Sequence, residues 1–269
     1  SFTGYDHHNN NISTTTDKCI YEIEDLAKEP GLIRLKGINT ICPRDGKLGA
    51  AYVDCLQGED HVGPANLMIS YTWGNKVSEV TSILNIYCDK NNRGSKRLYI
   101  WICCLCNNQH RVVEDRRNGK DIPFEEFRKV FQSKVIDIGN VIALVSPWDD
   151  PMYMKRVWCV YELFTASQSE ECTLTIEMPQ ATRDNLKKYL MTSKNSNFVK
   201  NKIYQVLGNT SIEEAQASVE SDKVNILKLV EEGEGYGSLN IKVNDLIRTW
   251  NKESLYGFLE DVKGEINGK

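Results

Sequence analysis

The sequence predicts an α/β fold: a flavodoxin-like parallel sheet flanked by helices over about 64–178, with a C-terminal helical extension over 179–269. Through the centre of the chain, short apolar runs that suit strands buried on both faces alternate with segments of helical periodicity. After Pro179 the sequence becomes polar and helical, without a repeat of roughly 20 to 50 residues. Residues 1–63 are expected to form a leader and an irregular lead-in that packs on the core.

The first strand and helix follow from a change of periodicity near residue 75. Residues 66–74 ("NLMISYTWG") are an apolar run that ends in a polar turn, as a buried strand does. Residues 77–88 then place apolar side chains from Val80 to Tyr87 at helical spacing. Together they predict the first strand–helix unit of the sheet.

The rest of the sheet continues this alternation. A second run, 97–105, is apolar on both faces and predicts a second strand. The segment 123–132 begins with Pro123, which suits a first helical turn, and its phenylalanines fall on one side of a helix. The remaining elements are a third strand over 141–148, a helix over 155–168 and a fourth strand over 172–178.

The two ends of the chain carry weaker patterns. Residues 1–16 are polar, lack the apolar core of a signal peptide, and suit a flexible leader or an expression remnant. Residues 19–31 predict a short helix closed by Gly31. The tail shows a capping box from Ser211 to Glu214, an apolar stripe through Val224, Leu227 and Val230, and a glycine-rich break over 233–237.

The composition indicates a globular chain with no nucleic-acid partner and no membrane partner. Of the 269 residues, 41% are hydrophobic, which is enough for a substantial core. The net charge is −4 with a pI near 5.7, and no basic stripe stands out. No run of about 18 apolar residues is present, so we expect no membrane-spanning helix.

The nine cysteines predict structural thiols in a reducing compartment, and hence a cytoplasmic location. Cys103, Cys104 and Cys106 look like a metal cluster, but on a strand Cys104 and Cys106 share a face that Cys103 does not. No Cys-x-x-Cys pair elsewhere completes a zinc site. We therefore expect no metal and no cofactor.

In a doubly wound sheet the ligand crevice lies beyond the carboxyl ends of the strands. This rule brings together the stretches 70–75, 106–111 and 146–151. The helix after the third strand begins at the same crevice and carries Glu162 within "RVWCVYEL" (156–163). A mid-helix glutamate is usually solvated, so Glu162 is either an ordinary surface residue or the working group of a site.

Several motifs resemble known families. The stretches "LMISYTWG", "VIALVSPW" and above all "RVWCVYEL" resemble the Toll/interleukin-1 receptor (TIR) domain superfamily, whose later helix carries Trp-Cys-x-x-Glu-Leu. In this sequence those positions are Trp158, Cys159, Glu162 and Leu163. The stretches "SYTWG" and "YIWICCLCNNQ" also resemble the related heterokaryon-incompatibility (HET) domain. The resemblance covers about residues 64–178.

The resemblance implies a TIR-like fold and a domain of stress or immune-type signalling that cleaves NAD+ or self-assembles into a homo-oligomer. By motif position, Glu162 corresponds to the catalytic glutamate of catalytic TIR domains. The sequence also departs from the patterns. Cys103 stands where the HET pattern has aspartate, Asn107 stands where it has isoleucine, and the segment after the second strand lacks the usual TIR loop signature.

One carboxylate is enough for this reaction. Glycoside hydrolysis ordinarily needs two, because an alkoxide leaving group must be protonated. Nicotinamide leaves NAD+ as a neutral molecule, so one carboxylate that stabilises the oxocarbenium charge and holds the ribose hydroxyls suffices. Tyr71, Trp73, Trp101 or Trp158 would supply aromatic walls, and the free amides of the next helix suit the pyrophosphate. The predicted site has Glu162 as catalytic residue and Ser70, Tyr71, Thr72, Trp73, Trp101, Asn107, Gln109 and Trp158 as substrate-binding residues.

Three functions stay open: an NAD+ nucleosidase that yields ADP-ribose or a cyclic form, a non-catalytic self-association module, and a sensor that binds NAD-like nucleotides without turnover. His110 has no partner acid at fixed spacing and is not assigned as a general base. Arg156 is expected to pair with Asp149 or Asp150 at the helix start. Other hydrolase signatures, including Gly-x-Ser-x-Gly, Walker and His-Glu-x-x-His motifs, are absent from the sequence.

Overall fold

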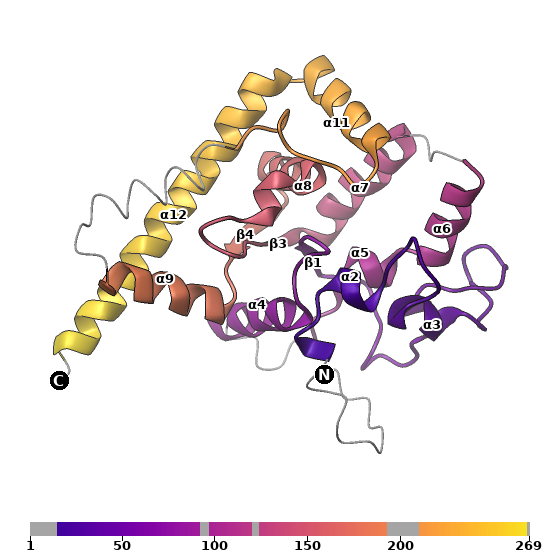
Figure 1. Ribbon diagram of the computed structural model, residues 1–269, viewed down its shortest axis with the longest axis horizontal. Helices are drawn as coiled ribbons and strands as arrows, with labels where there is room; N and C mark the ends of the chain where they lie inside the picture. The colour runs from indigo at the N-terminus through magenta and orange to yellow at the C-terminus, as the bar shows by residue number, and fades with distance from the viewer. Residues whose placement is uncertain (1–14, 92–96, 120–123, 193–209, 268–269) are drawn as a thin grey trace. The chain divides into compact units, whose positions relative to one another are not determined.

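The computed structural model describes residues 15–91, 97–119, 124–192 and 210–267. The chain divides into two compact units (Figure 1). The first, called unit 1, comprises residues 1–65 and 73–122, and the second, called unit 2, comprises residues 66–72 and 123–269. The short segment 66–72 therefore belongs with the C-terminal part of the chain, because it forms a strand there.

The predicted parallel sheet is confirmed. The strands follow the order β2-β1-β3-β4, which is the order of a flavodoxin-like doubly wound sheet. Within unit 2, β1 and β4 both pair in parallel with β3, which places Ser70 beside Ala143 and Ala143 beside Ile176. Every residue of β1 is buried, as expected for a strand covered on both faces. The bounds are β1 Leu67–Ser70, β2 Ile100–Trp101, β3 Asn140–Leu144 and β4 Thr173–Glu177.

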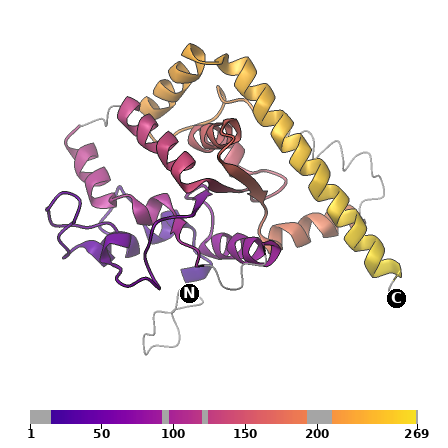
Figure 2. The ribbon, with the colours of Figure 1, turned by 180° about the vertical axis from the view of Figure 1, so that it is seen from behind.

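Helices of unit 2 cover the strands and then extend the chain. α7 packs on β1 and β3, and α8 packs on β1 and β4. Val157 and Leu163 of α8 are fully buried. α11 and α12 contact each other and α8, and Figure 2 shows the two meeting at an angle. The bounds are α7 Phe124–Ile138, α8 Val157–Gln168, α9 Gln180–Thr192, α11 Glu220–Glu232 and α12 Gly235–Asn267.

Unit 1 is built from short helices and one longer one. α4 confirms the predicted helix and buries Val80, Ile83 and Tyr87 on one face. Gly37 allows a close backbone approach, because a Cβ there would lie 2.1 Å from the Ala50 carbonyl oxygen. The bounds are α2 Ile20–Ile23, α3 Leu32–Gly37, a 3₁₀ helix at Val53–Cys55, α4 Val77–Lys90, α5 Cys103–Cys106 and α6 Gln109–Arg117.

Several local predictions were wrong. The second strand covers only Ile100–Trp101, and Cys103–Cys106 form helix α5, so the alternation argued for these cysteines does not apply. The first helix ends at Ile23 rather than near Gly31. In the tail, Ser211 bonds Glu213 in a turn, and α11 buries Ile226 and Val230 while leaving Val224 exposed.

No helix in the part of the chain that the structure describes is long and apolar enough to cross a membrane. Among the same residues, no group of three or more His, Cys, Asp or Glu side chains is arranged to hold a metal ion.

Candidate functional site

A hydrogen-bond chain joins the end of β1 to helix α8. Ser70 is the last residue of β1 and is 1% exposed, and its hydroxyl donates a hydrogen bond to Oε2 of Glu162. The Tyr153 hydroxyl lies 2.7 Å from Ser70 Oγ. Because the single Ser70 proton is directed at Glu162, the Tyr153 hydroxyl donates to Ser70. The order is therefore Tyr153 to Ser70 to Glu162.

The position of α8 is fixed by contacts at both sides of its first turn. Cys159 Sγ lies 3.6 Å from the Tyr71 carbonyl oxygen, directly after β1. At the helix start, Val157 N–H donates to the Gln216 carbonyl at 3.0 Å, and Gln216 N–H donates to the Lys155 carbonyl at 2.8 Å. These backbone bonds hold the first turn, so the side chain of Glu162 reaches Ser70 from a fixed helix.

Burial sets the protonation of this chain. Glu162 is partly buried, and removal of its carboxyl group from water raises the pKa to about 7, although the hydrogen bond from Ser70 opposes the shift. Tyr153 is 1% exposed, and burial raises its pKa well above the ordinary value, so the phenol stays neutral. The site thus holds one carboxyl group that is poised between its two protonation states near neutral pH.

Trp158 and Arg156 make contacts away from Glu162. The Trp158 indole N–H donates to Oδ2 of Asp222 in α11 at 3.1 Å, and its ring meets that of Tyr161 edge-on with centroids 6.4 Å apart. Arg156 Nη2 lies 2.6 Å from Ser218 Oγ. The predicted ion pair at the helix start was assigned to the wrong residue, because Lys155 pairs with Asp150 at 2.5 Å.

The predicted site residues are divided between the two units. Ser70, Tyr71, Thr72, Trp158 and Glu162 belong to unit 2, and the structure brings Ser70 and Glu162 into direct contact. Tyr71 and Thr72 are both 6% exposed at the carboxyl end of β1. The other four, Trp73, Trp101, Asn107 and Gln109, belong to unit 1.

Within unit 1, two of these side chains have local structural contacts. Gln109 is 5% exposed, and its amide donates to the carbonyls of Cys103, the first residue of α5, and Asn107, which follows its last residue. The Trp73 ring packs on Tyr21, with centroids 5.6 Å apart. Trp101 and Asn107 are partly buried. These contacts give Gln109 and Trp73 a role in the packing of unit 1.

Tyr153 is the site residue that the sequence argument missed. It lies in a 3₁₀ helix, Met152–Lys155, and is 83 residues from Ser70 along the chain. A short mixed segment of this kind has neither strand nor helix periodicity. The only signal was its position between the third strand and the Glu162 helix, at the predicted crevice.

Comparisons with known proteins add no relative. No family model, no curated protein and no solved structure matches this chain. A functional assignment therefore has to come from the chemistry of the residues themselves.

Proposed function

We propose that this chain is a TIR-like NAD+ nucleosidase that breaks the nicotinamide–ribose bond, with Glu162 as the catalytic residue. The observation that carries the proposal is the bond from Ser70 at the carboxyl end of β1 to Glu162, a carboxyl group with a raised pKa. In parallel α/β sheets this end of the strands is where ligands bind, and perturbed carboxyl groups concentrate at functional sites.

The reaction needs one fixed anion and no general acid. The bond between ribose C1′ and the pyridinium nitrogen breaks, its electron pair goes to nitrogen, and neutral nicotinamide departs. The ribose is left as an oxocarbenium ion, which the Glu162 carboxylate stabilises electrostatically. Water then adds to C1′ and releases a proton to give ADP-ribose, or a nucleophile elsewhere in the same ADP-ribosyl cation attacks C1′ in place of water and closes a cyclic form. The product takes part in stress or immune-type signalling.

The cationic substrate and the raised pKa fit together. A carboxyl group with a pKa near 7 is partly protonated in the free protein at neutral pH. The positive nicotinamide ring favours the ionised form, so substrate binding lowers this pKa and charges the site. Ser70 donates to the carboxylate and holds it in one orientation. We assign Tyr71 and Thr72, which follow Ser70 in unit 2, to substrate binding as part of this proposal.

Nicotinamide release from NAD+ tests the proposal. The purified chain is incubated with NAD+ at high protein concentration, because we propose that the domain acts as a homo-oligomer. Glu162→Gln keeps the shape and removes the charge, and should reduce turnover by about 100-fold or more. Glu170→Gln, an exposed position in the same unit, is the matched control and should keep wild-type turnover. Equal turnover in wild type and Glu162→Gln contradicts the assignment.

A non-catalytic self-association module is the second candidate. The observation in its favour is that Glu162 already accepts a bond from Ser70, so it joins α8 to β1 as a structural residue. A sensor that binds NAD-like nucleotides without turnover is a variant of this candidate. Binding of NAD+ without nicotinamide release, at a concentration where the chain is assembled, would favour the sensor. Assembly without NAD+ binding would favour the module.

A further inference from the structure

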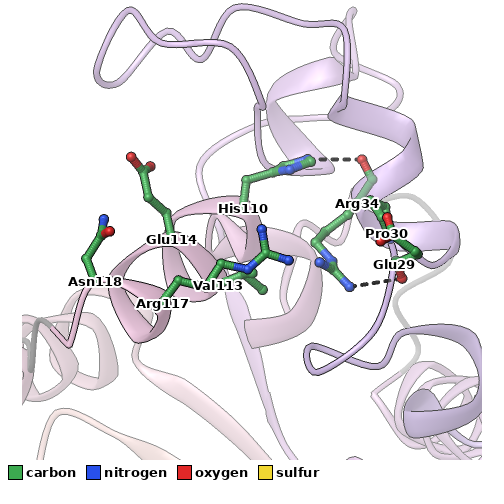
Figure 3. Close-up of a pocket in the computed structure, with 8 residues that line it drawn as sticks. All are labelled: Glu29, Pro30, Arg34, His110, Val113, Glu114, Arg117 and Asn118. Carbon is green, nitrogen blue, oxygen red and sulfur yellow. Dashed lines mark hydrogen bonds between the residues drawn. The ribbon is translucent and has the colours of Figure 1, made fainter.

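Unit 1 contains a hollow of about 350 Å³ between α6 and the segment that leads into α3 (Figure 3). This volume lies at the lower end of the range for small-molecule sites. One side is formed by Glu29, Pro30 and Arg34. The other side is a face of α6 and the residue after it, made of His110, Val113, Glu114, Arg117 and Asn118.

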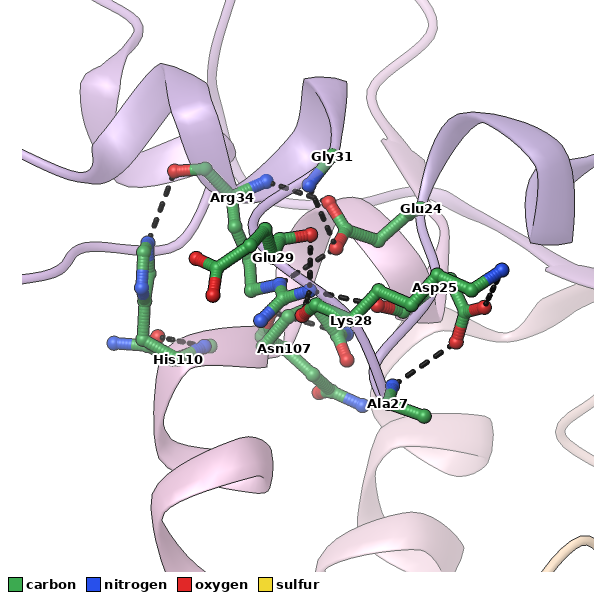
Figure 4. Close-up of polar contacts among 11 residues, drawn as sticks. Glu24, Asp25, Ala27, Lys28, Glu29, Gly31, Arg34, Asn107 and His110 are labelled. Carbon is green, nitrogen blue, oxygen red and sulfur yellow. Dashed lines mark hydrogen bonds and ion pairs between the residues drawn. The ribbon is translucent and has the colours of Figure 1, made fainter.

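One wall of the hollow is rigid because Arg34 is held on several sides (Figure 4). Arg34 and Glu24 are 4% and 0% exposed, and Arg34 Nε lies 2.6 Å from Glu24 Oε1. Arg34 Nη2 donates to the carbonyls of Asp25, Lys28 and Glu29 at 2.7, 3.0 and 3.2 Å. The charge of Arg34 is therefore compensated from behind by a carboxylate that does not line the hollow.

Two further lining groups, His110 and Glu114, also have partners within unit 1. His110 Nε2 lies 3.0 Å from the Arg34 carbonyl oxygen, and since a carbonyl only accepts, this nitrogen carries the proton. Burial lowers the pKa of His110, so the ring is neutral at pH 7. Glu114 accepts from Arg111 Nη1 at 3.4 Å. His110 therefore adds no charge to the hollow, whereas Glu114 shares Arg111 with Asp45, whose carboxylate lies closer, at 2.6 Å.

Arg117 and Glu29 remain as two charged side chains of opposite sign. Among the described residues, the side chains of both lack an ion-pair or hydrogen-bond partner, although both line the same hollow. Figure 3 shows the Arg117 side chain reaching from α6 towards Arg34, while Glu114 and Asn118 point away from it. Glu29 lines the opposite wall, and Val113, 7% exposed, adds an apolar side chain to the lining.

We propose that this hollow binds a small zwitterion of the α-amino acid class, with its carboxylate on Arg117 and its ammonium group on Glu29. A guanidinium group binds a carboxylate through a charge-assisted pair of hydrogen bonds, and a carboxylate binds an ammonium group in the same way. A ligand with one charge alone would leave the other lining charge without a partner. The site does not depend on the activity proposed for Glu162, because it lies within unit 1.

Calorimetric titration of the full chain with each of the twenty α-amino acids tests the site. At least one should bind with a dissociation constant of about 1 mM or tighter. Its N-acetyl derivative, which lacks the ammonium charge, and its methyl ester, which lacks the carboxylate, should each bind about tenfold more weakly or worse. Absence of binding by all twenty at about 10 mM, or equal affinity for the derivatives, overturns the proposal.

Variants locate the binding in the hollow. Arg117→Ala and Glu29→Gln should each weaken binding by about tenfold or more, and both positions are exposed, so folding should be unaffected. Arg116→Ala is the matched control, because Arg116 is an exposed neighbour that does not line the hollow. In Glu29→Gln, N-acetylation should cause no further loss, because the partner of the ammonium group is already absent. Equal weakening by Arg116→Ala and Arg117→Ala refutes the assignment.

Discussion

The raised pKa of Glu162 predicts that this residue lowers the stability of the protein at neutral and alkaline pH. Its pKa in the fold is about 7, against an ordinary value of 4.5. Between these values the folded state binds more protons than the unfolded state, so the free energy of unfolding falls as the pH rises. At about 1.4 kcal/mol per pH unit, the free energy of unfolding falls by about 3 kcal/mol in total, and this full loss is reached once the pH exceeds about 7.

Glu162→Gln removes this titration and keeps a carbonyl oxygen that accepts from Ser70. The variant should therefore gain stability relative to wild type as the pH rises from about 4.5 to about 8, by about 3 kcal/mol across that window. Urea denaturation of both proteins at several pH values measures the difference, in which the other titrating groups cancel. Glu170→Gln, an exposed control, should show no such trend. A difference for Glu162→Gln that stays constant with pH would show that burial does not perturb this carboxyl group.

Three further predictions follow from individual contacts. Ser70→Ala removes the bond that lowers the Glu162 pKa, so the midpoint of the Glu162 titration should move to higher pH. Carbon-13 NMR of the glutamate carboxyl carbons measures this midpoint, and an unchanged midpoint contradicts the prediction. Trp158→Phe removes the bond to Asp222 and should lower the free energy of unfolding by about 1 kcal/mol, as measured by urea denaturation. Adding Asp222→Ala to this variant should cause no further loss, because the bond is already absent. Glu24→Gln leaves the Arg34 charge buried with a neutral partner and should cost about 3 kcal/mol or more, whereas Glu29→Gln should change stability by less than about 0.5 kcal/mol.

The fold was predictable because its signals are local. Apolar runs that alternate with helical periodicity already specify strands and helices in the right order, and this order dictates a parallel sheet. The error at 97–105 has a physical cause. A short continuous apolar run suits a buried strand or a buried helix equally well, and here the chain leaves the sheet after Trp101 and turns into α5.

The site was predictable in part. The rule that ligands bind at the carboxyl ends of parallel strands placed Ser70 and Glu162 near one another, and the structure joins them across 92 residues of sequence. The same rule says nothing about hydroxyl groups that arrive from irregular segments, so Tyr153 was missed. The buried pair of Glu24 and Arg34 was missed for a similar reason, because charges in an irregular lead-in are normally solvated and only tertiary packing encloses them.

The energetics of Glu162 distinguish the two interpretations that its sequence position left open, a solvated surface residue and the working group of a site. A solvated glutamate has an ordinary pKa and makes no demand on its neighbours, whereas this carboxyl group has a raised pKa and takes the only proton of a buried serine. An ionised carboxylate in that position costs folding free energy at neutral pH. A carboxyl group whose ionisation opposes folding is typical of a functional site, since a neutral side chain of the same shape would stabilise the fold. A cationic substrate such as NAD+ would reverse that cost on binding, so NAD+ should raise the stability of wild type more than that of Glu162→Gln.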